Sequence, residues 1–301
     1  MDAAFSPPLD AVTYGLLTYG LLGAAVVALL ARARRLSIGA AALALAAACV
    51  GGIASWLAVL ALAVFLGLCL CHFRLPREDA RPAMRGALMV SGSAVMGVAI
   101  AFGYHVVPGF ENVKALDRVV LSPGAAPFTM YLNFDKVFAA VMLALAGGFF
   151  PPRFEVRPRR IAAVGTLMLG AAVLVVIPAG LAAGQIAFEP KIIDAFWLWL
   201  ANNLLFVVFA EEVIFRGMLQ GSLVRLCSHV GWPPLLGGAG GAGLFGLYHL
   251  PAGWAFVGLA AVTGLSYGYA FFKTRSLEAA IAVHFLDNLV HVLLFTYPRL
   301  A

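Results

Sequence analysis

Long apolar runs follow one another along almost the whole chain. A transmembrane helix needs about 20 consecutive, mostly apolar residues, and about ten runs approach that length. Because a run within lipid must satisfy its backbone hydrogen bonds internally, each run is expected to be helical. We therefore predict an all-α fold, a polytopic transmembrane helix bundle of about 8–10 spans. The predicted spans lie near residues 11–31, 36–53, 55–73, 86–107, 136–150, 161–183, 195–220, 236–250, 254–272 and 277–297.

The charged residues are consistent with a membrane protein. Only 11% of the residues are charged and 63% are hydrophobic, which is outside the range of soluble domains. The net charge of +6 comes from arginines in short clusters between apolar runs, as in cytoplasmic loops, so we predict no nucleic-acid partner. Loop 108–135 is then an outer surface cap, and both termini lie outside. Gly51 and Gly52 predict that the run Leu36–Phe73 is a hairpin of two helices.

Two acids and an arginine interrupt one of the apolar runs. Glu211, Glu212 and Arg216 lie among aliphatic and aromatic residues in Phe209–Gly217. Ionisable groups in hydrocarbon are costly unless they are paired or hydrated, so this stretch predicts a functional site. Glu212 and Arg216 are four residues apart and share a helix face, which predicts an ion pair. Glu211 points about 100° away from Glu212 and can face a different helix.

Further polar side chains follow on the next predicted helices, namely His249, His284 and Asn288. A single histidine in an apolar helix is usually a packing residue, but several polar groups on consecutive spans can stabilise one another. His284 and Asn288 are four residues apart and can face one cavity. We expect Glu211, His249 and His284 to meet about ten residues from the cytoplasmic face. For His249 this depth requires a bent helix that begins near Gly240.

These groups suit hydrolysis with water as the nucleophile. A carboxylate in a poorly solvated cavity can take a proton from water, while imidazole and amide groups donate hydrogen bonds to the oxyanion formed on a carbonyl. The spacing leaves open a second possibility, a zinc site made of Glu211, His249 and His284. The chain has no HExxH motif, which is the usual signature of a zinc protease.

Two other protease mechanisms explain fewer of these residues. Gly264–Gly268 matches GxSxG with Ser266 at its centre and resembles rhomboid proteases, but a serine mechanism gives Glu211 and His249 no role. The same glycines also form a small-residue stripe with which helices pack closely. An aspartyl mechanism lacks its GxGD signature, and Asp287 has no evident partner in the sequence.

Taken together, the motifs resemble the CPBP family, the CAAX prenyl protease and bacteriocin-processing group. The family pattern is EExxxR, FxxxH, a small-residue helix and HxxxN. In this chain the corresponding residues are Glu211, Glu212 and Arg216; Phe245 and His249; Gly264 and Gly268; and His284 and Asn288. The resemblance implies a CAAX-protease-like catalytic core in residues 191–301. Residues 1–190 are predicted to be N-terminal transmembrane helices of unknown role.

The resemblance also implies a glutamate-type intramembrane endopeptidase that needs no cofactor. The implied roles are a general base at Glu211, an assisting group at His249, an oxyanion hole at His284 and Asn288, and support from Glu212 and Arg216.

The implied substrates are C-terminal tails of membrane or lipid-linked proteins, cut near the bilayer. They are prenylated CAAX proteins or the sorting signals of an exosortase-like or myxosortase-like branch. The bias toward alanine, arginine and glycine is typical of GC-rich bacterial genomes, which favours sorting tails and the bacterial inner membrane. The alternatives are a non-enzymatic bacteriocin-immunity or scaffold protein, or a transporter with a proton-relay carboxylate. Neither alternative explains a His-xxx-Asn face together with His249.

Overall fold

The computed structural model of the chain describes residues 11–76, 82–151 and 158–301. The described part is mostly helical and contains one two-stranded sheet, so the prediction of a helical bundle is confirmed. The chain divides into two compact units. Unit 1 comprises Met1–Lys114 and Tyr131–Gly148, and unit 2 comprises Ala115–Met130 and Phe149–Ala301.

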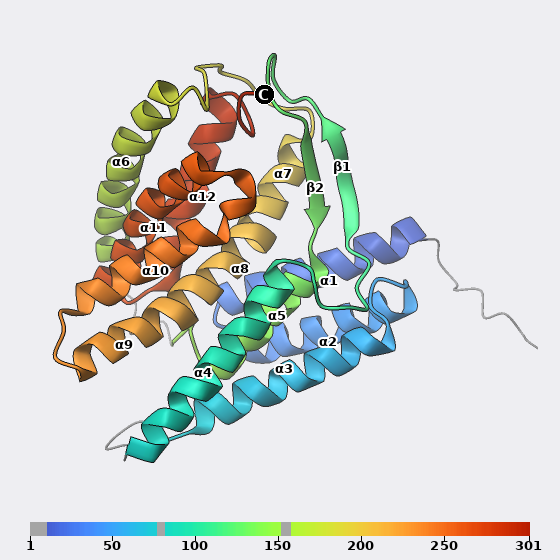
Figure 1. Ribbon diagram of the computed structural model, residues 1–301. Coiled ribbons are helices and arrows are strands. Elements are labelled where there is room, and N and C mark those ends of the chain that lie inside the picture. Colours follow the sequence, from blue (N-terminus) through green and yellow to red (C-terminus); the bar gives the residue numbers. More distant parts are fainter. Residues whose placement is uncertain (1–10, 77–81, 152–157) are drawn as a thin grey trace, which may run out of the picture. The chain divides into compact units, whose positions relative to one another are not determined.

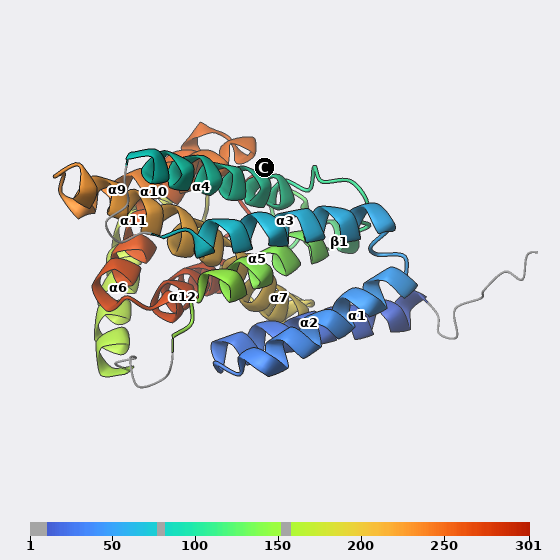
Figure 2. The same ribbon diagram turned by 90° about the horizontal axis from the view of Figure 1, so that it is seen from below.

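In the described part of unit 1, four helices surround a fifth. The helices are α1 (Ala11–Leu30), α2 (Arg34–Val50), α3 (Trp56–Arg74), α4 (Pro82–Gly103) and the surrounded helix α5 (Phe134–Gly147). Helix α5 contacts each of the other four (Figure 2). Its residues 134–144 are all buried. The predicted division of the run into two helices is confirmed, because α2 ends before Gly51 and Gly52, but α2 packs mainly against α1 and not against α3 as in a hairpin. Gly52 has a φ of +74°, a left-handed conformation that glycine adopts at little cost.

The described part of unit 2 is built on one long helix and four shorter ones (Figure 1). The long helix has five parts, α7 (Phe196–Asn202), the π-helix η2 (Asn203–Val208), α8 (Phe209–Glu212), the π-helix η3 (Val213–Gln220) and α9 (Gly221–His229). The others are α6 (Pro158–Ala182), α10 (Pro234–Tyr248), α11 (Trp254–Thr274) and α12 (Leu277–Leu294). Helix α11 packs against α6, α10 and α12, so it lies at the centre of this group.

Seven of the described helices are long and apolar enough to cross a membrane. They are Val12–Leu30, Trp56–Arg74, Ala83–Gly103, Pro158–Ala182, Phe196–His229, Trp254–Thr274 and Leu277–Leu294. Each of the other predicted runs also contains a helix, but α2, α5 and α10 have only 17, 14 and 15 residues. Such lengths are at or below the minimum of about 17 residues for a span. The chain is thus an integral multi-pass membrane protein.

Loop 108–135, which was predicted to be an outer surface cap, contains a β-hairpin that the sequence analysis missed. Its strands are β1 (Val113–Val119) and β2 (Phe128–Leu132), which pair in one sheet. Within unit 2, the side chain of Met130 in the hairpin packs in one hydrophobic cluster with Trp199 of α7 and Val292 of α12. The strand signal was present, since aromatic and β-branched residues of β2 follow a Pro-Gly turn. The hairpin covers the ends of two helices that also carry predicted site residues.

The prediction that the helix before His249 begins near Gly240 is wrong. Helix α10 begins at Pro234 and continues through the glycine run to Tyr248. The glycines serve close packing instead. A Cβ atom at Gly237 would lie 2.5 Å from the backbone nitrogen of Val224 in α9. The glycine run therefore brings α10 close to the long helix without interrupting α10.

The substitution Gly237→Ala is expected to lower the melting temperature of the protein in detergent. Overpacking typically costs about 1–3 kcal/mol, and here the clash is with backbone, whereas the gain in helix propensity from glycine to alanine is about 1 kcal/mol. Gly240→Ala is the matched control, because its Cβ would lie 3.6 Å from Leu223, an ordinary contact. Equal melting temperatures for the two variants would contradict this account of α10.

Candidate active site

The acidic doublet lies where the long helix of unit 2 changes its winding. Glu211 and Glu212 occupy the last two positions of α8, a short α-helical segment between the π-helices η2 and η3. Their exposed fractions are 5% and 0%. π-Helical turns are rare and are frequently found at functional sites. The doublet is thus a pair of buried carboxylates in a locally irregular part of the longest helix.

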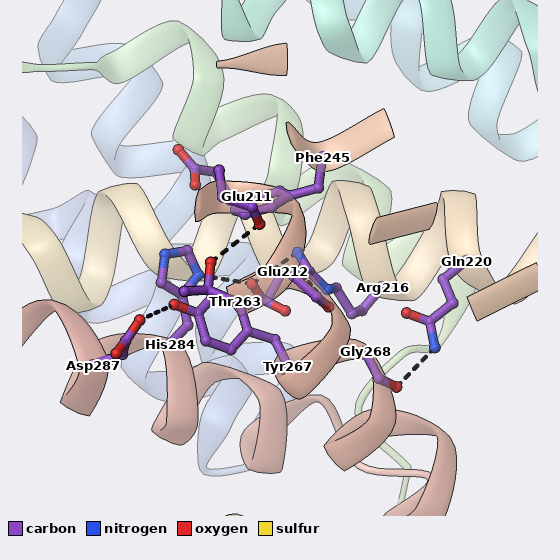
Figure 3. Close-up of polar contacts among 12 residues, drawn as sticks. Glu211, Glu212, Arg216, Gln220, Phe245, Thr263, Tyr267, Gly268, His284 and Asp287 are labelled. Carbon is purple, nitrogen blue, oxygen red and sulfur yellow. Dashed lines mark hydrogen bonds and ion pairs between the residues drawn. The ribbon is translucent and has the colours of Figure 1, made fainter. Parts of the chain in front are cut away.

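Glu212 is held by one side chain of its own long helix and one of α12 (Figure 3). Its Oε1 accepts hydrogen bonds from Arg216 at 3.1 Å and from Nδ1 of His284 at 2.7 Å. The Arg216 guanidinium also donates to the Gly264 carbonyl of α11 at 3.1 Å and lies over the Phe245 ring of α10 at 4.3 Å. The predicted Glu212–Arg216 ion pair is therefore present, and it is almost completely buried. It connects the long helix to α10, α11 and α12.

Glu211 faces a different histidine. Its Oε2 lies 3.9 Å from Nε2 of His249, and in Figure 3 its carboxylate points away from the Glu212–Arg216 pair. His249 follows the last residue of α10, where the turn η4 (Leu250–Ala252) begins. Its Nδ1 donates a hydrogen bond to the Phe245 carbonyl at 2.8 Å. A carbonyl can only accept, so in a neutral ring Nε2 presents its lone pair on the side of Glu211.

Phe245 lies between the two histidines of the site. Its ring centroid is 4.7 Å from that of His249 and 5.8 Å from that of His284. Phe245 is 2% exposed, so its ring is a buried apolar wall shared by both imidazoles. The structure therefore brings the predicted residues into one region, in which His249 pairs with Glu211 and His284 pairs with Glu212.

Asn288 lies one helical turn beyond His284 on α12. Its side-chain nitrogen donates to Oδ1 of Asn203 at 3.3 Å. Asn203 is the first residue of η2 and is 6% exposed. Because one N–H of Asn288 is directed to Asn203, the orientation of its amide is defined. His291, one turn further, instead donates to the Thr296 carbonyl at the end of α12.

The serine alternative finds little support in the geometry, whereas the zinc site stays a prediction. Among the described residues, no three His, Cys, Asp or Glu side chains are arranged to hold a metal ion. His284 directs Nδ1 to Glu212, as metal-ligating histidines commonly do toward a carboxylate, so its Nε2 would be the atom that joins Glu211 and His249 in a His₂Glu set. Ser266 lies in the middle of α11 and, within the described part, has no hydrogen bond to a histidine. Around Ser266, the glycines of the stripe contact α10 and the long helix closely, as predicted for a packing motif.

Several buried residues of the site were not identified as such from the sequence. Tyr267 and Asp287 form a hydrogen-bonded pair beside His284, with 2.5 Å between their oxygens. Gln220 donates to the Gly268 carbonyl at 2.8 Å, one turn beyond the contact of Arg216. Gln220 continues the i, i+4 stripe of Glu212 and Arg216, and this periodicity was the available signal. Asn203 gave no comparable signal, because it lies in η2, whose π-helical winding the sequence does not reveal.

The fold and these side chains define an integral membrane protein with buried carboxylate, imidazole and amide groups inside a helix bundle. Residues 193–290 match the family model described as "Type II CAAX prenyl endopeptidase Rce1-like". The C-terminal region of this chain is Rce1-like, which confirms the family resemblance, and the matched family is one of proteases. The matched segment lies within unit 2 and includes every predicted site residue from Glu211 to Asn288. No curated protein and no solved structure matches the chain.

Proposed function

We propose that the protein is an intramembrane endopeptidase in which Glu211 activates a water molecule. The observation that carries this proposal is the pairing of Glu211 with His249. Two hydrogen-bond acceptors, Oε2 of Glu211 and Nε2 of His249, lie 3.9 Å apart in a largely buried setting. A water molecule can donate one hydrogen to each of them, and its lone pairs then point away from both. This is the arrangement that a hydrolytic water requires.

The reaction begins with proton transfer from this water to Glu211, while the water oxygen attacks the carbonyl carbon of the scissile peptide bond. The tetrahedral intermediate carries a negative charge on the former carbonyl oxygen. The peptide C–N bond then breaks, and Glu211 returns the proton to the leaving amine. His249 holds the water and does not form a covalent bond to the substrate.

His284 and Asn288 are the proposed donors to the oxyanion. Nδ1–H of His284 already points to Glu212, so Nε2 carries a hydrogen only when the ring is an imidazolium. Glu212 is the counter-ion of that imidazolium as well as of Arg216. Asn288 uses one amide hydrogen for Asn203 and keeps the other for the substrate. In this proposal Glu212 and Arg216 support the site without touching the substrate.

The proposed substrates are the C-terminal, membrane-proximal tails of membrane or lipid-linked proteins. A site buried between helices of a multi-pass protein is reached most directly by a chain segment already at the bilayer. The matched family name refers to CAAX prenyl substrates, and the composition of this chain favours the sorting tails of bacterial surface proteins. We place the protein in the bacterial inner membrane on the same compositional ground.

The proposal is tested with purified protein in liposomes that also contain a membrane-anchored reporter. One reporter carries a prenylated CAAX tail and a second carries a hydrophobic sorting tail followed by basic residues. Mass spectrometry is expected to detect a new C-terminus near the membrane boundary in one of them. Intact tails on both reporters, together with intact tails on all surface proteins of the native host, would contradict the proposed function.

A further inference from the structure

We infer that Tyr267 and Asp287 are positioning residues that fix the imidazole of His284. This inference rests on the proposed function for its catalytic consequence, but the contacts themselves are independent of that proposal. Tyr267 lies in the GxSxG pattern of α11, and Asp287 directly precedes Asn288 on α12. Neither residue has a role in the hydrolytic steps described above. Both are buried, with exposed fractions of 2% and 9%.

The Tyr267 ring determines the plane of the His284 ring. The two rings stack with their centroids 4.4 Å apart and an angle of 12° between their planes. On another side, the Phe245 ring meets His284 edge-on at 87°. With Nδ1 bonded to Glu212, the imidazole is contacted on three sides. It cannot rotate about its Cβ–Cγ bond without losing the stacking and the hydrogen bond together.

Asp287 in turn fixes Tyr267. The Tyr267 hydroxyl donates a hydrogen bond to Oδ2 of Asp287. Asp287 and His284 are three residues apart on α12, so they are neighbours on the surface of that helix. Asp287 of α12 therefore binds Tyr267 of α11, and the Tyr267 ring in turn packs on His284, which is also on α12.

This arrangement has a direct chemical consequence for His284. Its Nε2 has no hydrogen-bond partner among the described residues, and a fixed ring keeps this atom in one direction. An oxyanion donor is effective only if it is already oriented when charge develops on the substrate. Loss of that orientation lowers the rate of the chemical step, and a displacement of about 1 Å can cost about 100-fold. Tyr267 and Asp287 are thus expected to affect kcat rather than KM.

The test compares the variants Tyr267→Phe, Asp287→Leu and Asp287→Asn. Tyr267→Phe keeps the stacked ring and removes the hydroxyl, and Asp287→Leu removes the acceptor. Each is expected to lower kcat for reporter cleavage by about tenfold or more, with KM within about twofold. Asp287→Asn retains an acceptor oxygen and is expected to restore most of the activity. Tyr269→Phe is the matched control, because it makes the same change on the same helix at a half-exposed position beside Lys273.

A second measurement does not depend on activity. The imidazole nitrogens of ¹⁵N-histidine-labelled protein are observed by NMR in micelles, and His284 is assigned by its absence in His284→Gln. Tyr267→Phe and Asp287→Leu are expected to shift or broaden the His284 signals, whereas Tyr269→Phe leaves them unchanged. Unchanged His284 signals in both site variants would overturn the inference. If wild-type protein cleaves no reporter while these signals still shift, the proposed function fails and the positioning of His284 stands.

Discussion

Replacing Arg216 with alanine is expected to lower the free energy of unfolding by about 3–5 kcal/mol. The substitution leaves the carboxylate of Glu212 without its guanidinium partner at a position with no exposed surface. It also removes the hydrogen bond to Gly264 and the stacking on Phe245, which connect three helices. The effect is measured by denaturant titration in mixed micelles. Helix content or tryptophan fluorescence can report the folded fraction.

Two further variants separate charge pairing from packing. Arg225→Ala removes an arginine from an exposed position of α9 and is expected to change stability by less than about 0.5 kcal/mol. The double variant Glu212→Leu/Arg216→Met replaces the buried ion pair with apolar groups and is expected to be more stable than Arg216→Ala alone. If the double variant is as unstable as Arg216→Ala, the uncompensated charge of Glu212 is not the cause of the lower free energy of unfolding.

Glu211→Gln is expected to lower kcat for tail cleavage by about 10²–10⁴-fold, the usual contribution of a general base. The amide has nearly the same shape as the carboxylate, but it cannot take a proton from water. Stability is expected to change little, because Glu211 is outside the Glu212–Arg216 ion pair. The rate is measured under single-turnover conditions in liposomes, with the folded fraction of each sample determined in parallel.

Matched variants make the Glu211 result specific. Glu111→Gln makes the same change at an exposed position in unit 1 and is expected to cleave at the wild-type rate. Ser266→Ala is also expected to retain activity, since Ser266 has no part in the proposed reaction. Loss of cleavage in Ser266→Ala with full cleavage in Glu211→Gln would favour the serine mechanism.

The sequence was sufficient to predict the helices but not their exact course. In the described part of the chain, apolar runs of membrane length identified each of the long helices, although the long helix of unit 2 continues through α9 beyond its predicted end. The hairpin β1–β2 was missed, since a short extramembrane segment carries no such constraint. The start of α10 was placed near Gly240 because that start would bring His249 to the depth of the other site residues, and the packing role of Gly237 is not visible in the sequence. In the structure it is a point of close approach to the backbone of Val224.

The spacing of residues in the sequence predicted which side chains belong to the candidate site. It did not predict all of the contacts between them. The i, i+4 relation correctly predicted the contact of Glu212 with Arg216. The partner of His284 depends on how α12 packs against α8, and a single sequence does not specify this packing. Asp287 had no evident partner for the same reason, because Tyr267 is 20 residues away on another helix. The catalytic roles of Glu211, His249, His284 and Asn288 stay proposals.

The central claim is that the Glu211 carboxylate, and not a bound metal ion, activates the water. The most direct measurement is the cleavage rate of purified wild-type and Glu211→Gln protein in the same liposomes, before and after exhaustive chelation and with the metal content determined. The account predicts an unchanged wild-type rate after chelation and a Glu211→Gln rate that is about 10²–10⁴-fold lower in either condition. A wild-type rate that falls on chelation and returns on addition of zinc, or a Glu211→Gln variant that cleaves normally, would contradict it.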